Sequence, residues 1–362
     1  MEKNEICVIY GKDYKEMTKK ILRTSELAEL IPSKDTLVGI KPNLVSPSEA
    51  SYGATPHPDI VAGLLEYLQE NGFQTMVILD GSWVGDRTSD ALEICGYRSL
   101  CERYGVEFWD TQKDGSYQEE CRGMKLNLCD SVRKIEFLVN VPVWKGHCQT
   151  KITCALKNLK GLIPNSEKRR FHSMGLHAPI AHLNCGIHQD FIVVDHICGD
   201  LDFEDGGNPV VCDRILTARD PVLCDAYVCE KMHYRLEEVP YVGLAQDLGV
   251  GSADLSKLVL HSCQEVEEEL PYARKIVELR DAVEEVESCS ACYGYLIPAL
   301  DRLREEGKFS MLREKICIGQ GYRGKTGELG IGNCTRKFRH SLEGCPPTEN
   351  QIYDFLKEFL ER

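Results

Sequence analysis

The sequence predicts an α/β protein whose mostly parallel sheet is flanked by helices, with a cysteine-rich cap at its C-terminal end. Short apolar runs of the kind that form buried strands alternate with longer segments whose apolar residues recur at helical spacing, as in parallel sheets. This alternation stops near residue 263, after which cysteine and glycine become frequent. We therefore expect an α/β domain over residues 1–263 and a separate C-terminal region over residues 264–362.

The individual elements follow from local patterns in the first region. Apolar runs rich in β-branched residues predict strands; they cover 6–10, 36–40, 75–80, 106–110, 134–143, 191–195, 214–218 and 257–262. Apolar residues at helical spacing predict the helices between them; these cover 14–30, 58–72, 89–104, 150–160, 221–232 and 240–247.

The C-terminal region is predicted to hold three helices and one strand. The helices cover 271–287, 295–306 and the segment from Thr348 onward, and the strand covers 311–319. Thr348 and Gln351 have the spacing of a capping box, which marks the start of the last helix.

The composition limits the class of partner. The formal charge is −14, which argues against nucleic acid or an anionic membrane as the main partner. The N-terminal residues are charged, and no apolar run approaches the roughly 18 residues of a membrane span. We therefore expect a cytoplasmic protein with no nucleic-acid or membrane partner; a homodimer is compatible with the sequence.

Eighteen cysteines are the most unusual feature of the composition. A chain of this length builds its own core and needs no disulfides, and without an export signal its thiols are expected to be reduced. Most of them should be buried as small hydrophobic residues. Such a high cysteine content favours an anaerobic or strongly reducing cell.

Four cysteines of the C-terminal region have the pattern of a metal site. Cys289 and Cys292 form a C-x2-C pair, which places two thiolates on one turn. Cys334 lies in a glycine-rich segment, and Cys345 precedes a proline as cysteine ligands of ferredoxins do. The pattern predicts one [4Fe–4S] cluster in residues 264–362. A zinc site, unliganded buried thiols, and Cys317 in place of one ligand are the alternatives.

A second cluster of candidate residues follows the strand predicted at 134–143. It contains the cations and histidines Lys145, His147, Lys157, Lys160 and His172. In so acidic a chain this local basicity favours an anionic ligand such as a carboxylate or phosphate. A solvated cationic helix face is the alternative.

These residues suggest roles in a cleft. We predict catalytic roles for Lys145, His147, Lys157 and His172, because histidine titrates near neutrality and can transfer protons. Predicted substrate-binding residues are Asn43, Asp80, Ser82, Asn158 and Lys160. The loops of Asn43 and Asp80 each follow a strand, so parallel strands would bring them to one sheet edge.

Motifs between residues 36 and 260 resemble the family called domain of unknown function 362. They are Lys41-Pro42-Asn43, Thr55-x-His57-Pro58, Asp80-Gly81-Ser82, Asn140-Val141-Pro142, Lys145-x-His147, Lys157-Asn158-x-Lys160-Gly161 and Asp220-Pro221-Val222-x-x-Asp225. Members of this family are often iron–sulfur proteins, so the resemblance also implies a cluster. The family's activity is largely unassigned.

A fainter similarity links the chain to the nickel-pincer lactate racemases. The order and spacing of His147, Lys157 and His172 resemble the residues that line their cofactor site. The resemblance implies that Lys157 carries the cofactor and His147 transfers a proton. The racemases have a catalytic histidine after a glycine in an earlier loop, where this chain has Gly81-Ser82-Trp83.

Together these patterns predict an iron–sulfur oxidoreductase that acts on a small anionic substrate, with the cluster as electron conduit or Lewis acid. A redox partner such as a ferredoxin would then be needed. The alternatives are an electron-transfer or cluster-carrier protein without its own substrate, a nickel-pincer-like racemase or epimerase, and a zinc-stabilised binding protein.

Overall fold

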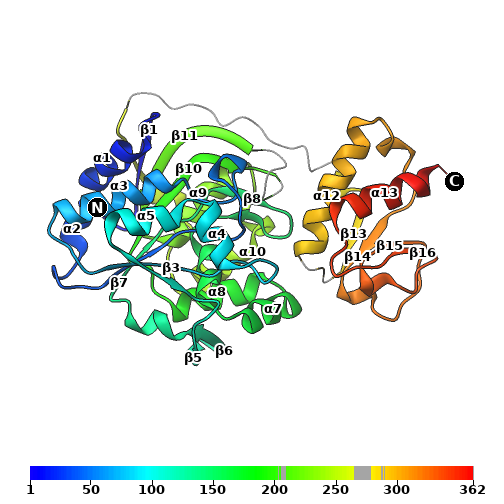
Figure 1. The fold of residues 1–362 in the computed structure, drawn as a ribbon, viewed down its shortest axis with the longest axis horizontal. Helices are drawn as coiled ribbons and strands as arrows, with labels where there is room; N and C mark the ends of the chain where they lie inside the picture. Colours follow the sequence, from blue (N-terminus) through cyan, green and yellow to red (C-terminus); the bar gives the residue numbers. More distant parts are fainter. Residues whose placement is uncertain (203, 205–208, 265–278, 287, 289, 362) are drawn as a thin grey trace.

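The computed structural model describes residues 1–202, 204, 209–264, 279–286, 288 and 290–361. It contains a large α/β body and a smaller C-terminal body (Figure 1). Two apolar clusters form the core of the large body, and a third cluster, which includes Leu279, Leu300 and Leu356, forms the core of the small one.

An eight-stranded sheet runs through the large body in the order β12-β1-β11-β10-β7-β2-β3-β4. Its strands are β1 (Glu5–Tyr10), β2 (Val38–Lys41), β3 (Met76–Asp80), β4 (Glu107–Asp110), β7 (Phe137–Asn140), β10 (Phe191–Asp200), β11 (Pro209–Ala218) and β12 (Val259–Ser262). Only β11 runs antiparallel to its neighbours among these described pairs. The prediction of a mostly parallel α/β sheet flanked by helices is confirmed.

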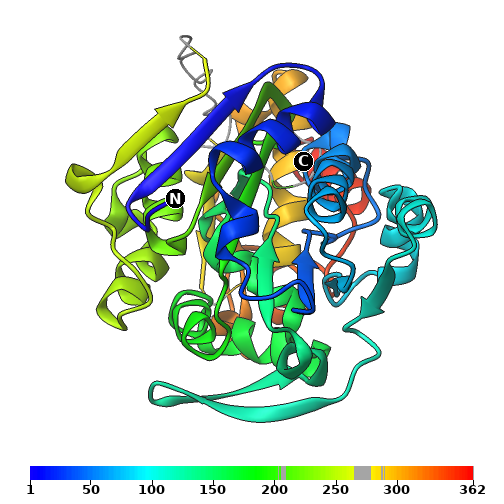
Figure 2. The same ribbon diagram turned by 90° about the vertical axis from the view of Figure 1, so that its left-hand side faces the viewer.

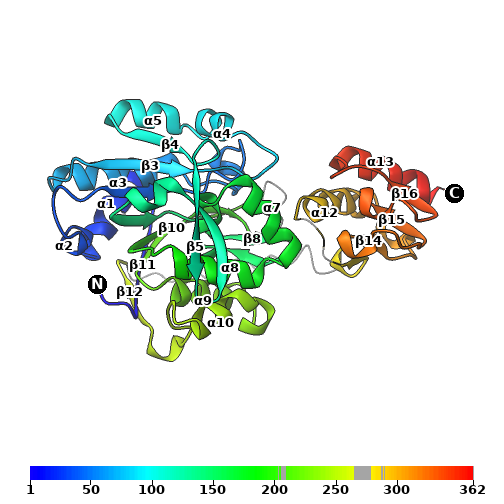
Figure 3. The ribbon, with the colours of Figure 1, turned by 90° about the horizontal axis from the view of Figure 1, so that it is seen from below.

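Helices cover both faces of this sheet (Figures 2 and 3). One face carries α1 (Tyr14–Thr24), α2 (Leu27–Leu30), α3 (Pro58–Glu70), α4 (Thr88–Ile94) and α5 (Tyr97–Tyr104). The other carries α6 (Ala155–Asn158), α8 (His177–Gly186), α9 (Pro221–Lys231) and α10 (Pro240–Asp247), and α7 (Asn165–Met174) lies beside α8. The two apolar clusters of the core therefore lie on opposite faces of one sheet.

Three local features differ from the sequence prediction. The helix expected at 89–104 is divided at Gly96, which has a left-handed φ of 77°. The helix expected at 150–160 begins only at Ala155, because β8 (Lys145–His147) and β9 (Lys151–Thr153) pair as a short hairpin. A second hairpin, β5 (Ser116–Cys121) with β6 (Met124–Cys129), was not predicted.

The small body is built on four short parallel strands in chain order. They are β13 (Val283–Glu285), β14 (Ile316–Ile318), β15 (Leu329–Ile331) and β16 (His340–Leu342), accompanied by α12 (Ser290–Glu305) and α13 (Glu349–Leu360). The helix predicted at 271–287 lies mostly outside the described residues. The C-terminal part of this helix prediction is wrong, because residues 283–285 form β13, in which Val283 pairs with Ile316.

No helix in the described part of the chain is long and apolar enough to cross a membrane.

A buried ion pair joins the strands that carry the predicted cleft. Lys41 Nζ lies 2.6 Å from Asp80 Oδ1, and both side chains are almost completely buried. Asp80 also accepts hydrogen bonds from the backbone N–H groups of Gly81 and Leu44. Gly161 packs against this pair so closely that a Cβ atom would lie 1.9 Å from Asp80 Oδ1.

We therefore expect Gly161→Ala to destabilise the fold by about 1–3 kcal/mol, the usual cost of overpacking a core. Gly243→Ala is the matched control, because Gly243 lies in α10 and a Cβ there meets nothing within 4 Å. Alanine should be neutral or stabilising at that helical position by up to about 1 kcal/mol. Urea unfolding measures both; equal midpoints for the two variants would contradict the close packing.

Candidate functional site

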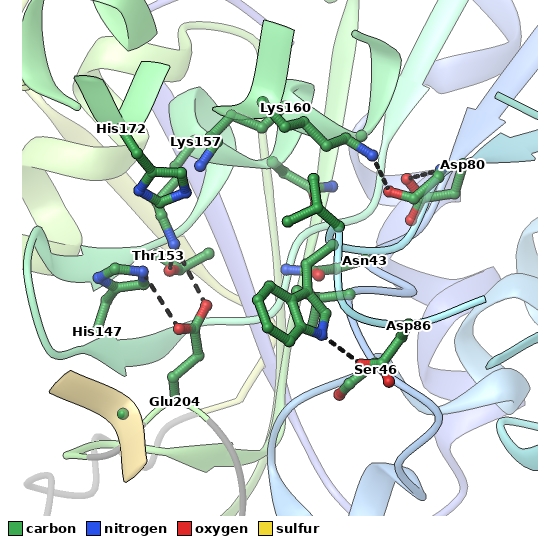
Figure 4. A pocket seen from close by; sticks show the side chains of 18 of the residues that line it. Asn43, Ser46, Asp80, Asp86, His147, Thr153, Lys157, Lys160, His172 and Glu204 are labelled. Atoms are coloured by element: carbon green, nitrogen blue, oxygen red, sulfur yellow. Dashed lines mark hydrogen bonds and ion pairs between the residues drawn. The ribbon is translucent and has the colours of Figure 1, made fainter. Parts of the chain in front are cut away.

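A cavity of about 300 Å³ opens where β2, β3 and β7 end (Figure 4). Its walls come from the loops after these strands, from α6 and α7, and from α12 of the C-terminal body. The side chains that line it include Lys41, Asn43, Asp80, Trp83, His147, Thr153, Lys157, Asn158, Lys160, Lys168, His172, Glu204 and Tyr295. The cavity therefore lies between the two bodies of the chain.

Glu204 is the central carboxylate at one end of the cavity. Its Oε2 lies 3.2 Å from His147 Nε2, and its Oε1 lies 3.3 Å from Lys157 Nζ and 3.8 Å from Lys145 Nζ. Burial alone would raise its pKa, but the neighbouring His147 and the charges of Lys157 and Lys145 hold the pKa of this carboxyl far below its usual value. Glu204 is thus ionised and neutralises part of the lysine charge.

His147 is held in one neutral tautomer. Its Nδ1 accepts hydrogen bonds from the backbone N–H groups of Gln149 and Thr150, at 3.0 and 3.1 Å. The proton of the neutral ring is therefore on Nε2, where it faces Glu204. Burial keeps the pKa of His147 well below its usual value. With its Nε2 proton directed at Glu204 and its Nδ1 occupied by two N–H groups, His147 has no free nitrogen with which to accept a proton.

His172 is chemically different from His147. Its Nδ1 is buried and makes no hydrogen bond within the described part of the chain. Burial, followed by the charges of Lys160 and Lys157, lowers the pKa of His172 to about 3. The ring is therefore neutral across the physiological range, and the residue lines the cavity.

The other end of the cavity is basic. Lys168 donates hydrogen bonds to the carbonyl oxygens of Gly81 and Ser82, at 2.9 and 2.7 Å. Burial lowers the pKa of Lys168 to about 8 and that of Lys160 to about 7, and the charge of Lys157 contributes at Lys160. An anion bound here would stabilise both ammonium groups.

The structure places most, but not all, of the predicted cleft residues in this cavity. Asn43, Asp80, His147, Lys157, Asn158, Lys160 and His172 line it. Lys145 is fully buried behind Glu204 and donates to the carbonyl of Ala54 at 2.8 Å. Ser82 is also buried, and its hydroxyl donates to the carbonyl of Leu44 at 2.6 Å. The catalytic and binding roles of the set stay predictions.

Asn158 lines the cavity, but its side-chain amide makes hydrogen bonds within the protein. Its Nδ2 donates to Asn140 Oδ1 at 2.7 Å and lies 3.3 Å from the carbonyl oxygens of Lys41 and Pro42. Asn140 in turn donates to the carbonyl of Ala155 at 2.9 Å. These amides fix α6, and hence Lys157 and Lys160, against the end of β2.

Sequence reasoning missed Glu204, Trp83 and Tyr295 as cavity residues. Glu204 lies in a polar loop after a strand, and no motif distinguishes it from other loop carboxylates. Its importance comes from cations that lie about 50 residues earlier in the chain and meet it only in the folded protein. Tyr295 lines the cavity from α12 of the C-terminal body. Hydrophobic periodicity predicts a helix there but does not predict how that helix is placed against the α/β body.

Two groups of described residues bring three ligand atoms within 4.8 Å of one another. In the group His147, Cys148 and Glu204, two lysines lie beside the carboxylate, and burial raises the pKa of Cys148 to about 12. In the group Cys154, Cys224 and Asp225, the carboxylate accepts the N–H groups that open α6. Both arrangements are satisfied by the protein's own bonds and do not favour a metal ion.

Three of the four cysteines predicted as cluster ligands, Cys292, Cys334 and Cys345, lie near one edge of the small sheet. Cys334 follows β15 and Cys345 follows β16, and these strands are parallel, so both residues lie at the carboxyl edge. Cys292 is in the first turn of α12, and its Sγ lies 3.6 Å from the position of a Cβ on Gly332. Cys289 lies outside the described residues. Cys317 lies within β14 rather than beyond its end.

A hydrogen bond connects the two candidate sites. Gln149, two residues after His147, donates through Nε2 to the carbonyl of Ser288 at 3.2 Å. Arg280 donates to the carbonyl of Cys148 at 3.0 Å. The loop that fixes the His147 tautomer is therefore attached to the segment that leads into Cys289.

The sheet and the cavity at the carboxyl ends of its strands define an α/β protein with a ligand cleft at one sheet edge. Residues 38–230 match the family described as Domain of unknown function (DUF362), and the match covers more than half of the chain. The chain belongs to this family, as its motifs predicted. A search of curated proteins found no match.

Among solved structures, the lactate racemase apoprotein from Thermoanaerobacterium thermosaccharolyticum is similar with a TM-score of 0.43 and 15% sequence identity. The alignment covers 62% of this chain and 56% of the racemase, so the chain spans little more than half of that protein.

The lowered pKa of Lys160 predicts a pH-dependent stability. Below about pH 7 the folded and unfolded states both hold its proton, whereas between about pH 7 and 10 the unfolded state binds more protons than the folded state. Its contribution to stability therefore rises with pH. Lys160→Met should unfold at higher urea than the parent protein at pH 7, and this advantage should shrink as the pH approaches about 10.

Lys113→Met is the control, because the Lys113 side chain is 75% exposed and its ion pair with Asp110 lies on the surface. Its effect should not change over the same range of pH. A constant difference between Lys160→Met and the parent protein would show that Lys160 is protonated in the folded state.

Proposed function

We propose that this protein is a [4Fe–4S] oxidoreductase that acts on a small anionic substrate bound in the cavity. The main support for this proposal is that α12 contributes both to the wall of the basic cavity and to the set of predicted cluster cysteines. Tyr295 and Gly294 of this helix line the cavity, and Cys292 lies in its first turn.

The spacing of the four cysteines supports a cluster, with a C-x2-C pair, a third cysteine in a glycine-rich segment and a fourth before a proline. A zinc ion with four cysteine ligands is the alternative that metal analysis would distinguish. Gly332 leaves space beside Cys292 for backbone N–H groups to approach sulfide.

When bound, the cluster would supply or accept one electron at a time, which requires a redox partner of the ferredoxin kind. The cavity residues would do the rest. Lys157 and Lys168 attract an anion, His147 holds Glu204 beside Lys157, and Lys160 and His172 line the same cavity, where His172 transfers protons. The cavity volume suits a ligand of a few heavy atoms.

The alternatives lead to different observations. A cluster carrier or electron-transfer protein would bind iron and sulfide but no small anion. A nickel-pincer-like racemase would bind nickel through a cofactor on Lys157, whose amine donates to Thr153 at 2.9 Å in this structure. We also propose a cytoplasmic location, which agrees with reduced thiols.

Anaerobically purified protein should contain about four irons and four sulfides per chain, with a broad visible absorbance that dithionite bleaches. Cys345→Ser should lose most of this absorbance, since Cys345 is an exposed cysteine at the carboxyl edge of the small sheet. Cys263→Ser is the control, because Cys263 lies in the large body and should leave the iron content unchanged. Stoichiometric zinc or nickel without sulfide would reject the proposal.

The anion site is tested separately with pyruvate and inorganic phosphate as probes. Calorimetry should detect binding of at least one probe to the parent protein, and Lys157→Ala should weaken this binding at least about tenfold, the effect of losing one charged contact. The absorbance of the cluster should not change. Lys113→Ala should bind like the parent protein; equal binding by Lys157→Ala would exclude Lys157 from the site.

A further inference from the structure

Lys160 differs from the other lysines that line the cavity. Lys41 is paired with Asp80, Lys157 donates to Thr153 and lies 3.3 Å from Glu204, and Lys168 donates to two carbonyl groups. The amine of Lys160 makes no hydrogen bond or ion pair with any residue in the described ranges. A partly buried ammonium without a partner is costly, so the neutral amine is favoured.

The surroundings of Lys160 reinforce this preference. Lys157 lies three residues earlier on the same helical surface, and the charges of Lys157 and Lys168 both disfavour a proton on Lys160. Glu204 acts in the opposite direction, but it is already paired with His147 and Lys157. A neutral amine beside cationic neighbours is the arrangement that activates lysine as a nucleophile.

A proton-transfer group lies on the same side of the cavity. Figure 4 shows His172 beside Lys157 and Lys160, and all three residues line the cavity. His172 lines the same cavity as Lys160, and we assign its neutral imidazole the relay of protons between the amine and a ligand.

We propose that Lys160 is a nucleophile that forms an imine with a small 2-oxo acid, whose carboxylate is held by Lys157 and Lys168. A 2-oxo acid combines the two groups that this end of the cavity recognises: a carboxylate for the cationic amines and a carbonyl carbon for the neutral one. This inference rests on the proposed anion site and names its substrate class.

The reaction balances without a further reagent. The neutral Lys160 nitrogen, which carries two protons, forms a bond to the carbonyl carbon, and the electron pair of the broken C–O π bond goes to oxygen. His172 relays the first nitrogen proton to that oxygen, which becomes a hydroxyl group, and then relays the second nitrogen proton to the hydroxyl group. That group leaves as water when the C=N bond forms, so amine and 2-oxo acid give imine and water.

The test is to trap the imine in the full chain. The protein is incubated with pyruvate and sodium cyanoborohydride, which reduces an imine to a stable secondary amine, and the labelled lysine is located by mass spectrometry. We expect one reduced pyruvate adduct, on Lys160. Lys160→Arg retains a cationic side chain but cannot form the imine, and it should lose the adduct. Lys113→Arg should keep it.

Calorimetry with pyruvate, without reductant, separates this inference from the anion site. An adduct confined to Lys160 supports the imine. Pyruvate binding without an adduct, or labelling spread over exposed lysines and retained in Lys160→Arg, overturns the imine and leaves the anion site standing. If pyruvate neither binds nor forms an adduct, the imine is overturned and pyruvate is excluded as a ligand of the site. Binding of inorganic phosphate then still tests the proposed anion site.

Discussion

The cavity depends on the buried carboxylate of Asp80. Its Oδ1 pairs with Lys41 and accepts the N–H of Gly81, while its Oδ2 accepts the N–H of Leu44. One side chain thus fixes the ends of β2 and β3, and Gly161 packs against it. Removing one partner of a buried pair commonly costs about 3–5 kcal/mol. Asp80 therefore holds the cavity wall together, and its oxygens are already occupied by the protein's own groups.

The electrostatics of the cavity give it two unlike ends. The chain is strongly acidic, yet several buried lysines converge on this one place. Glu204 offsets the charge at the end with His147 and Lys157, whereas Lys160 and Lys168 have no carboxylate among the ion pairs of the described residues. An anion would gain most at this second end. This difference is the reason to place a substrate toward this end, with its reacting carbon beside Lys160 and its carboxylate held by Lys168 together with Lys157.

The sequence allowed the sheet and much of the cavity to be predicted, because both follow from local patterns and one topological rule. Apolar runs in the sequence predicted the strands. Because β2 and β3 are parallel, the loops that follow them bring Asn43 and Asp80 to one edge of the sheet. Periodicity could not anticipate that Lys145 would lie in a hairpin behind Glu204, or that the Ser82 hydroxyl would bond to Leu44. Those outcomes depend on contacts between distant segments, which carry no local signal.

The position of α12 links the two parts of the proposed chemistry. Cys292 and Tyr295 are three residues apart, so they lie on one side of this helix, and Tyr295 lines the cavity. In the α/β body, Gln149 of the loop after His147 donates a hydrogen bond to the carbonyl of Ser288, which precedes Cys289 in the sequence. A cluster held by these cysteines would therefore be adjacent to the cavity. An electron carrier needs an exposed cluster but has no use for a basic cavity beside it, so this arrangement favours an enzyme over a carrier.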